Sequence, residues 1–247
     1  TESLPVVRVY SLGPLEVILG DQTLSDRVWK TQKAKYLFAR LAYSAPRPMS
    51  VDRILEDLWP DSEEEGARNS LNTAVSTIRR VLKGTNEHFD PVLRVNETLA
   101  LNPQLPLWHD VKELELAHSH AQRSLEAGNL EEAMPQLSRV ALLYRGPYLE
   151  GCYLDWSVER QIALENTTID ALSRLAEHRV EQYRHREALE YALLLLLLQP
   201  VHVRAHECGM SAHIGLEQHD KAAAHFEAQR TRLSREQLGD PSMEMTK

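Results

Sequence analysis

Residues 68–83 carry side chains suited to the edges of nucleic-acid bases and to phosphates. The stretch holds four Lys or Arg residues and no acidic residue. An Asn amide can bond adenine through two hydrogen bonds, a guanidinium can bond guanine, and Ser and Thr hydroxyls can bond either bases or phosphates. A helix that is merely solvated usually mixes Glu with Lys to form intrahelical pairs. The absence of acids therefore favours a DNA-facing surface over a solvated one.

The spacing of apolar residues within this stretch predicts a helix from about Glu64 to Lys83. The apolar stripe consists of Ala67, Leu71, Ala74, Val75, Ile78 and Leu82. The opposite, polar face consists of Asn69, Asn72, Thr73, Ser76, Thr77, Arg80 and Lys83, with Arg68 and Arg79 at its margins. A helix with one apolar stripe packs that stripe on a core and exposes the rest.

The amino-terminal part of a helix-turn-helix recognition helix enters the major groove, and this geometry divides the polar face into two sets. The predicted base-facing residues are Asn69, Asn72, Thr73 and Ser76. The predicted phosphate-facing residues of the helix are Arg68, Arg79, Arg80 and Lys83.

Other basic residues extend the predicted DNA-binding surface. Lys30, Lys33 and Lys35 lie around the start of the preceding helical pattern, where side-chain charge and free backbone N–H groups both suit a phosphate. Simple solubility is the alternative role for these lysines. Arg94 lies on a predicted hairpin, from which it could reach a minor groove or the DNA backbone.

The surrounding pattern predicts the elements that hold this helix. Residues 6–30 alternate and break at turn signals, which predicts a small antiparallel sheet whose last strand contains Val28 and Trp29. Apolar residues at steps of three and four predict one helix after Thr31 and a second from Ser50 to Trp59. Residues 91–95 and 98–101 predict a hairpin. A sheet, three helices and a hairpin together predict a winged helix-turn-helix over residues 1–105.

Residues 106–247 predict an all-α domain that resembles tetratricopeptide repeats, so the expected fold class is mainly α. Strand signals end near Pro106. Three alanines mark the second helices of helical hairpins, namely Ala133, Ala188 and Ala222. The last two are 34 residues apart, which is the tetratricopeptide period. An additional segment around residues 153–166 interrupts the array.

The charge of the chain is divided unevenly. The net charge is −8, which taken alone argues against a nucleic-acid partner. Residues 1–105 have a net charge of only −1, however, and residues 106–247 have −7. Residues 27–53 hold seven basic side chains and one acid. The acidity therefore lies mostly outside the predicted DNA-binding domain.

Other functional classes have little support in the sequence. No nucleophile or acidic pair suggests catalysis, no glycine-rich loop suggests a nucleotide, and we expect neither a cofactor nor a metal. His202 and His206 have helical spacing but lack the Glu of a metalloprotease helix. Cys152 and Cys208 stand alone and are expected to be reduced packing residues. The absence of a leader or a membrane-length apolar run leads us to expect a cytoplasmic, nucleoid-associated protein.

Several short stretches, in their order and spacing, resemble the Streptomyces antibiotic regulatory protein family and related bacterial activators over nearly the whole chain. The stretches in the first part are residues 12–17, 29–35, 50–55, 58–60, 67–72 and 78–82. The second part resembles the bacterial transcriptional activator domain at residues 144–149, 155–156, 159–160 and 233–241. The predicted wing departs from these relatives by carrying Thr98 and Leu99 where a Gly-Tyr pair is common. Residues 238–243 come where relatives usually continue into another helix, which leaves a downstream domain open.

The resemblance implies an OmpR-type winged helix that binds tandem direct repeats upstream of a promoter and helps to recruit RNA polymerase, partly through its sigma factor. It implies that the helix of residues 64–83 enters the major groove and that Arg94 on the wing touches neighbouring backbone. It also implies that polymerase meets the acid-rich link between the second and third helices. The acids of this link are Asp57, Asp61, Glu63, Glu64 and Glu65.

We therefore expect a sequence-specific transcriptional activator, not an enzyme, whose partners are double-stranded DNA and RNA polymerase. A homodimer on DNA and an unidentified small-molecule effector at the helical-repeat domain stay open. The alternative hypothesis is a helical-repeat adaptor or effector sensor whose acidic second part is the working surface. The two hypotheses differ in one respect that can be measured, because residues 1–105 alone should bind DNA only under the first.

Overall fold

The computed structural model describes residues 4–83 and 88–236, and these residues divide into two compact units. The first unit contains the chain up to Leu116 together with Leu143–Ile162. The second contains Ala117–Leu142 and the residues from Ala163 onward. The described residues are mainly helical, and all of their strands lie in the first unit, which agrees with the fold class predicted from the sequence.

The first unit contains two small sheets. The larger sheet has the strand order β3-β2-β1-β7, and its strands are β1 (Val7–Tyr10), β2 (Glu16–Leu19), β3 (Gln22–Thr23) and β7 (Leu107–His109). Strand β1 pairs antiparallel with β2 and parallel with β7. The smaller sheet has the order β4-β6-β5, with β4 (Met49–Ser50), β5 (Val92–Val95) and β6 (Thr98–Leu101). Strands β5 and β6 form the predicted wing hairpin.

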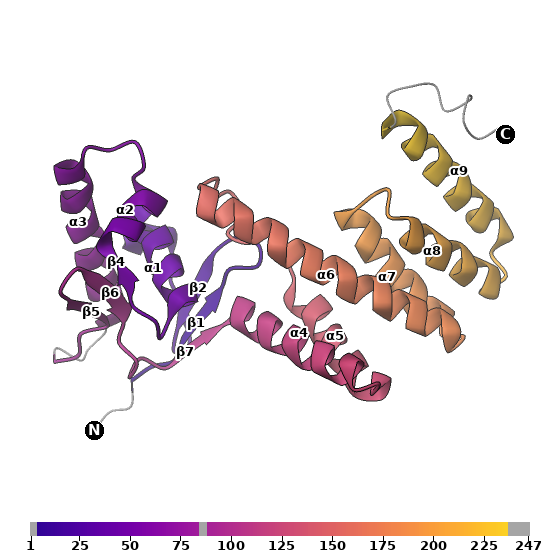
Figure 1. Cartoon of the computed structure of the whole chain (residues 1–247), viewed down its shortest axis with the longest axis horizontal. Helices are drawn as coiled ribbons and strands as arrows, with labels where there is room; N and C mark the ends of the chain where they lie inside the picture. Colours follow the sequence, from indigo (N-terminus) through magenta and orange to yellow (C-terminus); the bar gives the residue numbers. More distant parts are fainter. Residues whose placement is uncertain (1–3, 84–87, 237–247) are drawn as a thin grey trace. The chain divides into compact units, whose positions relative to one another are not determined.

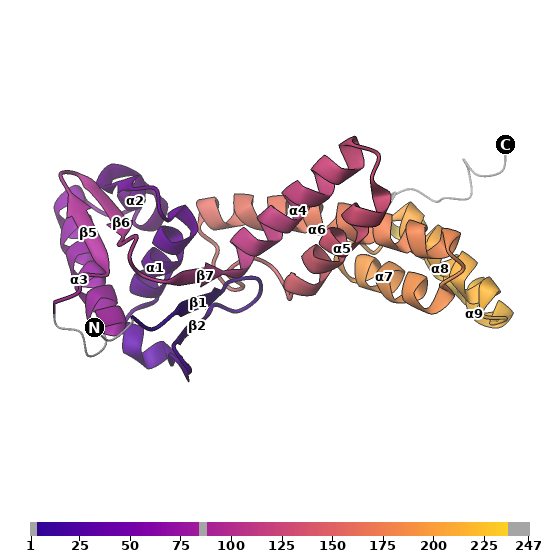
Figure 2. The same ribbon diagram turned by 90° about the horizontal axis from the view of Figure 1, so that it is seen from below.

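Three helices complete the winged helix, and all three agree with the sequence prediction. They are α1 (Gln32–Ser44), α2 (Val51–Leu58) and α3 (Glu64–Lys83). The Thr31 hydroxyl accepts a hydrogen bond from the Ala34 backbone N–H at 3.2 Å, and Ser50 caps α2 in the same way. Figures 1 and 2 show α1 between the two sheets, where its apolar side chains form the centre of the core.

The prediction of a strand at Val28 and Trp29 is wrong. These residues belong to the 3₁₀ helix η1 (Asp26–Trp29). The Trp29 indole is buried and stacks on Phe38 of α1, with ring centroids 5.1 Å apart. Burial of this large ring against α1 outweighs the extended conformation that the local alternation favours.

A segment far along the chain completes the core of the first unit. The Leu149 N–H donates to the Ser11 carbonyl at 2.7 Å, the Gly13 N–H donates to the Pro147 carbonyl at 3.0 Å, and the Tyr148 side chain is fully buried. A Cβ atom on Gly146 would lie 3.2 Å from the Gly13 Cα, so the two backbones meet where neither carries a side chain. Residues 153–162, most of the segment predicted to interrupt the helical repeats, follow this stretch and also belong to the first unit.

The start of α4 (Asp110–Glu126) is fixed to the end of β1 by the buried Asp110 carboxylate. This carboxylate accepts hydrogen bonds from the Ser11 N–H at 2.7 Å and the Leu12 N–H at 2.9 Å. Burial raises the pKa of Asp110, and burial lowers the pKa of the neighbouring His109 to about 3. Two ionisable groups thus lie inside the core where β7 joins α4.

The described residues of the second unit form helices and the turns that connect them. Its elements are parts of α4 and α6 (Asp155–Glu181), together with α5 (Leu130–Leu143), α7 (His185–Leu198), α8 (Val203–Gly215) and α9 (His219–Glu236). Ala133, Ala188 and Ala222 are each the fourth residue of α5, α7 and α9, and all three are buried. Consecutive helices α7, α8 and α9 contact one another in series, as in a repeat array.

Among the described residues, no helix is both long enough and apolar enough to cross a membrane.

We predict that Tyr148→Ala destabilises the first unit by about 3 kcal/mol, because it removes a fully buried aromatic ring. Denaturant unfolding followed by tryptophan fluorescence measures this change selectively, since all four tryptophans lie in the first unit. The matched control is Tyr153→Ala, which removes a ring that is 86% exposed in the same segment and should change stability by less than about 0.5 kcal/mol. Equal effects of the two substitutions would show that the segment is not part of this core.

Candidate nucleic-acid interface

Helix α3 presents one buried and one exposed face. Leu71 and Ile78 are buried in its apolar stripe, and α3 contacts α1, α2 and β5. The four predicted base-facing side chains are all exposed, namely Asn69, Asn72, Thr73 and Ser76. The prediction that Thr77 lies on the exposed polar face is wrong, because this residue is buried. It lies one turn after Ala74 and therefore shares the flank of the buried stripe.

Arg68 joins three elements at the amino-terminal end of α3. Its guanidinium donates to Glu64 at 3.1 Å, to Glu97 on the wing turn at 2.9 Å and to Asp52 on α2 at 3.4 Å. Hydrogen bonds to Glu97 and Glu64 raise the pKa of this already basic group. The contact holds the wing and the start of α3 in a fixed relation.

The wing also touches the exposed face of α3 directly. Arg94 of β5 donates through Nη1 to the Asn72 side-chain oxygen at 2.9 Å. Asn96, at the turn between β5 and β6, has φ of 51°, a left-handed conformation that Asn adopts more readily than most residues. A predicted base-facing residue and the predicted wing contact therefore lie together.

Two arginines in the carboxyl-terminal half of α3 make contacts within the first unit. Arg79 donates to Asp90 at 2.9 Å and to the Val92 carbonyl at 2.7 Å, which attaches the start of β5 to α3. Arg80 donates to the Val28 carbonyl at 2.7 Å and so contacts η1. Both arginines remain partly exposed or exposed. Each therefore positions α3 while keeping surface that a phosphate could reach.

The predicted phosphate-facing lysines differ in whether their ammonium groups already have a partner within the first unit. Lys35 is buried and forms an ion pair with Asp26, and Lys33 donates to the Leu58 carbonyl at the end of α2. Lys30 is exposed, and Lys83 is partly exposed. The latter two have no ion-pair partner among residues 4–83 and 88–236.

The acids of the link between α2 and α3 also differ in burial and in whether they pair with an arginine. Asp57 is buried and accepts from Arg40 Nε at 2.8 Å and from Arg53 Nε at 3.0 Å. Glu64 is exposed but pairs with Arg68. The other three acids, Asp61, Glu63 and Glu65, are exposed.

Sequence reasoning missed the carboxylates that organise this surface. Glu97, Asp52 and Glu64 hold Arg68, and of these only Glu64 has the i, i+4 spacing that predicts its partner. The pairs that cross from one element to another depend on the tertiary fold. Within the described part of the chain, no group of three or more His, Cys, Asp or Glu side chains could hold a metal ion.

Two family patterns match the chain. The bacterial transcriptional activator domain matches residues 109–247, and the pattern described as "Transcriptional regulatory protein, C terminal" matches residues 25–96. The second match contains η1, the three helices of the winged helix and β5, the first strand of the wing. The first begins at the last residue of β7.

Individual relatives agree with these matches. The "Transcriptional regulatory protein EmbR" of Mycobacterium tuberculosis and of Mycobacterium bovis is 28% identical over 144 residues, which are 56% of this chain and 35% of each relative. The chain thus spans about a third of the length of these curated relatives.

The fold is also shared with a solved structure, "Mycobacterium tuberculosis EmbR in complex with low affinity phosphopeptide". It superposes with a TM-score of 0.73 and 21% identity over 96% of this chain and 62% of that chain. Since the activator-domain match alone takes in more than half of the chain, the protein belongs to the bacterial transcriptional activator domain family, a family of transcriptional regulators, and it is similar to the Streptomyces antibiotic regulatory proteins.

Proposed function

We propose that this regulator is a sequence-specific activator that places the exposed face of α3 in the major groove of double-stranded DNA. The observation that carries the proposal is the composition of that face, which exposes Asn, Thr and Ser side chains with no acidic residue in residues 68–83. A carboxylate in the groove would be repelled by the phosphates, and amides and hydroxyls can bond base edges.

The base-facing residues differ in how free their polar groups are. Within the described residues, the side chains of Asn69 and Ser76 make no hydrogen bond, so both can bond a base without losing a partner. The Thr73 hydroxyl donates to the Asn69 carbonyl at 3.0 Å, which leaves its oxygen as an acceptor and its methyl group for apolar contact. The Asn72 oxygen accepts from Arg94, so the wing orients the amide before DNA arrives.

The phosphate-facing set is centred on cations that are exposed or partly exposed. Lys30, Lys83 and Arg80 can reach a phosphate, and Arg68, Arg79 and Arg94 can do so by exchanging carboxylate partners at the surface. Lys33 and Lys35 would each have to leave a contact within the first unit. We therefore propose that these two lysines contribute less to phosphate binding than the other cations do.

The resemblance supports direct repeats as the target, bound by two copies of the chain on one promoter. A winged helix has no internal two-fold axis, so two copies on tandem repeats would lie head to tail. In the cell, such a regulator would be associated with the nucleoid. Both points are proposals that depend on DNA binding by α3.

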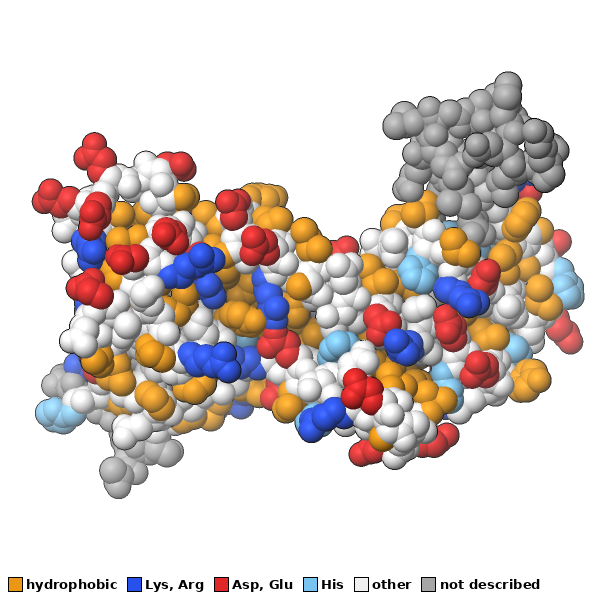
Figure 3. Space-filling model, viewed as in Figure 1, with side chains coloured by type: hydrophobic (Ala, Val, Ile, Leu, Met, Phe, Trp, Pro, Cys, Tyr) orange, Lys and Arg blue, Asp and Glu red, His pale blue; other side chains and the backbone are white. Residues whose placement is uncertain are grey.

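We further propose that the link between α2 and α3 contacts RNA polymerase. Figure 3 shows acidic side chains gathered over this link. Beside it lies a hollow of about 330 Å³ lined by apolar Leu55, Trp59 and Pro60 together with acidic side chains. Exposed acids next to an aromatic hollow suit a partner surface that is basic and partly apolar.

DNA binding by the full chain should weaken steeply as salt rises, because each neutralised phosphate releases counterions. Sites would first be located by a genome-wide binding map and then used in duplex titrations.

Arg80→Ala should weaken binding to all duplexes alike and reduce the salt slope by about one, whereas Asn72→Ala should relax discrimination at particular base pairs by about 1–3 kcal/mol. The matched control is Arg123→Ala, an exposed arginine of the second unit that should leave binding unchanged. Salt-insensitive binding, or base-specific loss in Arg80→Ala alone, would contradict the assignment.

If the link contacts polymerase, removal of its exposed charges should reduce activation without weakening DNA binding. The triple variant Asp61→Asn, Glu63→Gln, Glu65→Gln removes exposed charge but spares Glu64, the partner of Arg68. In transcription with purified polymerase, the variant should bind its promoter normally and activate it several-fold less. A control variant would neutralise three exposed acids of the second unit, Glu131, Glu181 and Glu190. Full activation by the triple variant would rule out this contact.

A further inference from the structure

A cavity of about 640 Å³ lies in the first unit, away from the residues assigned above to base recognition. Its walls come from the end of α1, the loop that leads to β4, the start of α2 and the first turns of α4. Pro46, Pro48 and Met49 supply apolar surface. The volume is within the range of about 300–1,000 Å³ that is typical of small-molecule sites.

Four cationic side chains line this cavity, and two of them form ion pairs. Arg40 and Arg53 share the buried Asp57 carboxylate, at 2.8 and 3.0 Å. Among the described residues, Glu115 is the one acid that lines the cavity, and it is itself paired with Arg160 and accepts from the Tyr43 hydroxyl at 3.2 Å. The acids near the cavity are therefore already engaged by other groups.

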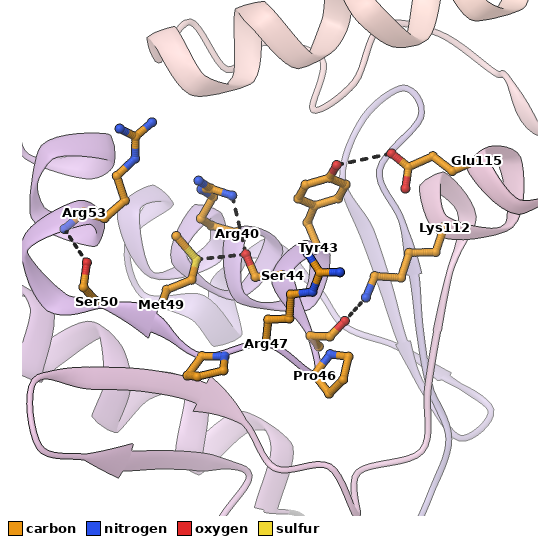
Figure 4. Close-up of a pocket in the computed structure, with 12 residues that line it drawn as sticks. Arg40, Tyr43, Ser44, Pro46, Arg47, Met49, Ser50, Arg53, Lys112 and Glu115 are labelled. Atoms are coloured by element: carbon orange, nitrogen blue, oxygen red, sulfur yellow. Dashed lines mark hydrogen bonds between the residues drawn. The ribbon is translucent and has the colours of Figure 1, made fainter. Parts of the chain in front are cut away.

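The remaining two cations, Arg47 and Lys112, have no carboxylate within ion-pair distance among the described residues. Arg47 is exposed at the cavity, and the Lys112 amine donates to the Ala45 carbonyl. Figure 4 shows the ends of both side chains extending into the same space. Burial and the charge of Arg47 lower the pKa of Lys112, as expected when two like charges face each other.

We propose that this cavity binds a phosphorylated small molecule whose phosphate lies between Arg47 and Lys112. A guanidinium offers parallel N–H donors and an ammonium offers a compact charge, and a dianionic phosphate can satisfy both at once. The organic part would rest on Pro46, Pro48 and Met49. The site lies in the first unit and is thus distinct from the effector site left open in the helical-repeat domain.

The position of the cavity gives such a ligand a structural role. Arg47 lies in the loop between α1 and β4, and Lys112 lies in the first turn of α4. A phosphate held by both would connect a loop of the winged helix to α4 and add to the contact that Asp110 makes with β1. Binding at this site does not require that α3 bind DNA, so the two proposals can fail separately.

The test is calorimetric titration of the full chain with inorganic pyrophosphate and with ADP, in chloride buffer of constant ionic strength. In a thermal melt of the same chain, either probe at a hundred times its dissociation constant should raise the melting temperature by roughly 5 °C. Arg47→Gln and Lys112→Met should each weaken binding at least tenfold. Arg47 is exposed, so its variant should fold normally, and Lys112→Met keeps the length of the side chain. Arg123→Ala, which removes a charge outside the cavity, should bind as the parent chain does.

Three results would overturn the proposal. The first is no binding of either probe at millimolar concentration. The second is equal binding by the parent chain and by Arg47→Gln, since the phosphate would then lie elsewhere. The third is a loss of DNA affinity by Arg47→Gln and Lys112→Met with no probe present, which would identify the cavity as a contact for the DNA backbone. Tighter binding of ADP than of pyrophosphate would support a phosphate ester over a free phosphate as the ligand.

Discussion

The buried carboxylate of Asp110 is the interaction on which the first unit depends. It accepts the backbone N–H groups of Ser11 and Leu12 where β1 ends, and it is also the first residue of α4. A buried carboxylate is costly, but two buried N–H groups without acceptors would be costly as well, and each group offsets the penalty of the other. Because Ser11 and Leu12 also pair with the backbone around Tyr148, one side chain holds together the sheet, the start of α4 and a segment that arrives much later in the sequence.

The arginines of α3 explain how the helix can be held in place and still be available to a polyanion. Arg68 reaches α2 and the wing, Arg79 reaches β5, and Arg80 reaches η1. Exposed ion pairs of this kind contribute little to folding, typically about 0–1 kcal/mol each, so exchanging a carboxylate for a phosphate costs little. The buried stripe through Leu71 and Ile78 supplies the lasting attachment of α3.

The elements that the sequence predicts well are those specified by neighbouring residues. Helices α1, α2 and α3 and the wing have clear periodicity, caps or turn residues, and α3 has the predicted bounds. Failures arise where distant residues decide. Trp29 is helical because Phe38 packs on it, β7 exists because β1 lies beside it, and residues 143–162 join the first unit through backbone pairing that no local pattern encodes. The exposed site residues were predictable from helical spacing, whereas the burial of Asp57 and the pairing of Lys35 depend on the folded core.

The late segment that carries Tyr148 also sets the order in which the protein can form during synthesis. A domain made from the first residues of a chain can usually fold as soon as it leaves the ribosome. Here the part of the core around Tyr148 is completed only after residues 143–162 have emerged, and residues 130–142 of α5, which belong to the second unit, emerge before them. A cut at residue 105 would therefore separate the winged helix from β7, from the Asp110 carboxylate and from the segment that carries Tyr148. A gene fusion that transfers the winged helix intact has to carry β7, the start of α4 and the returning segment as well.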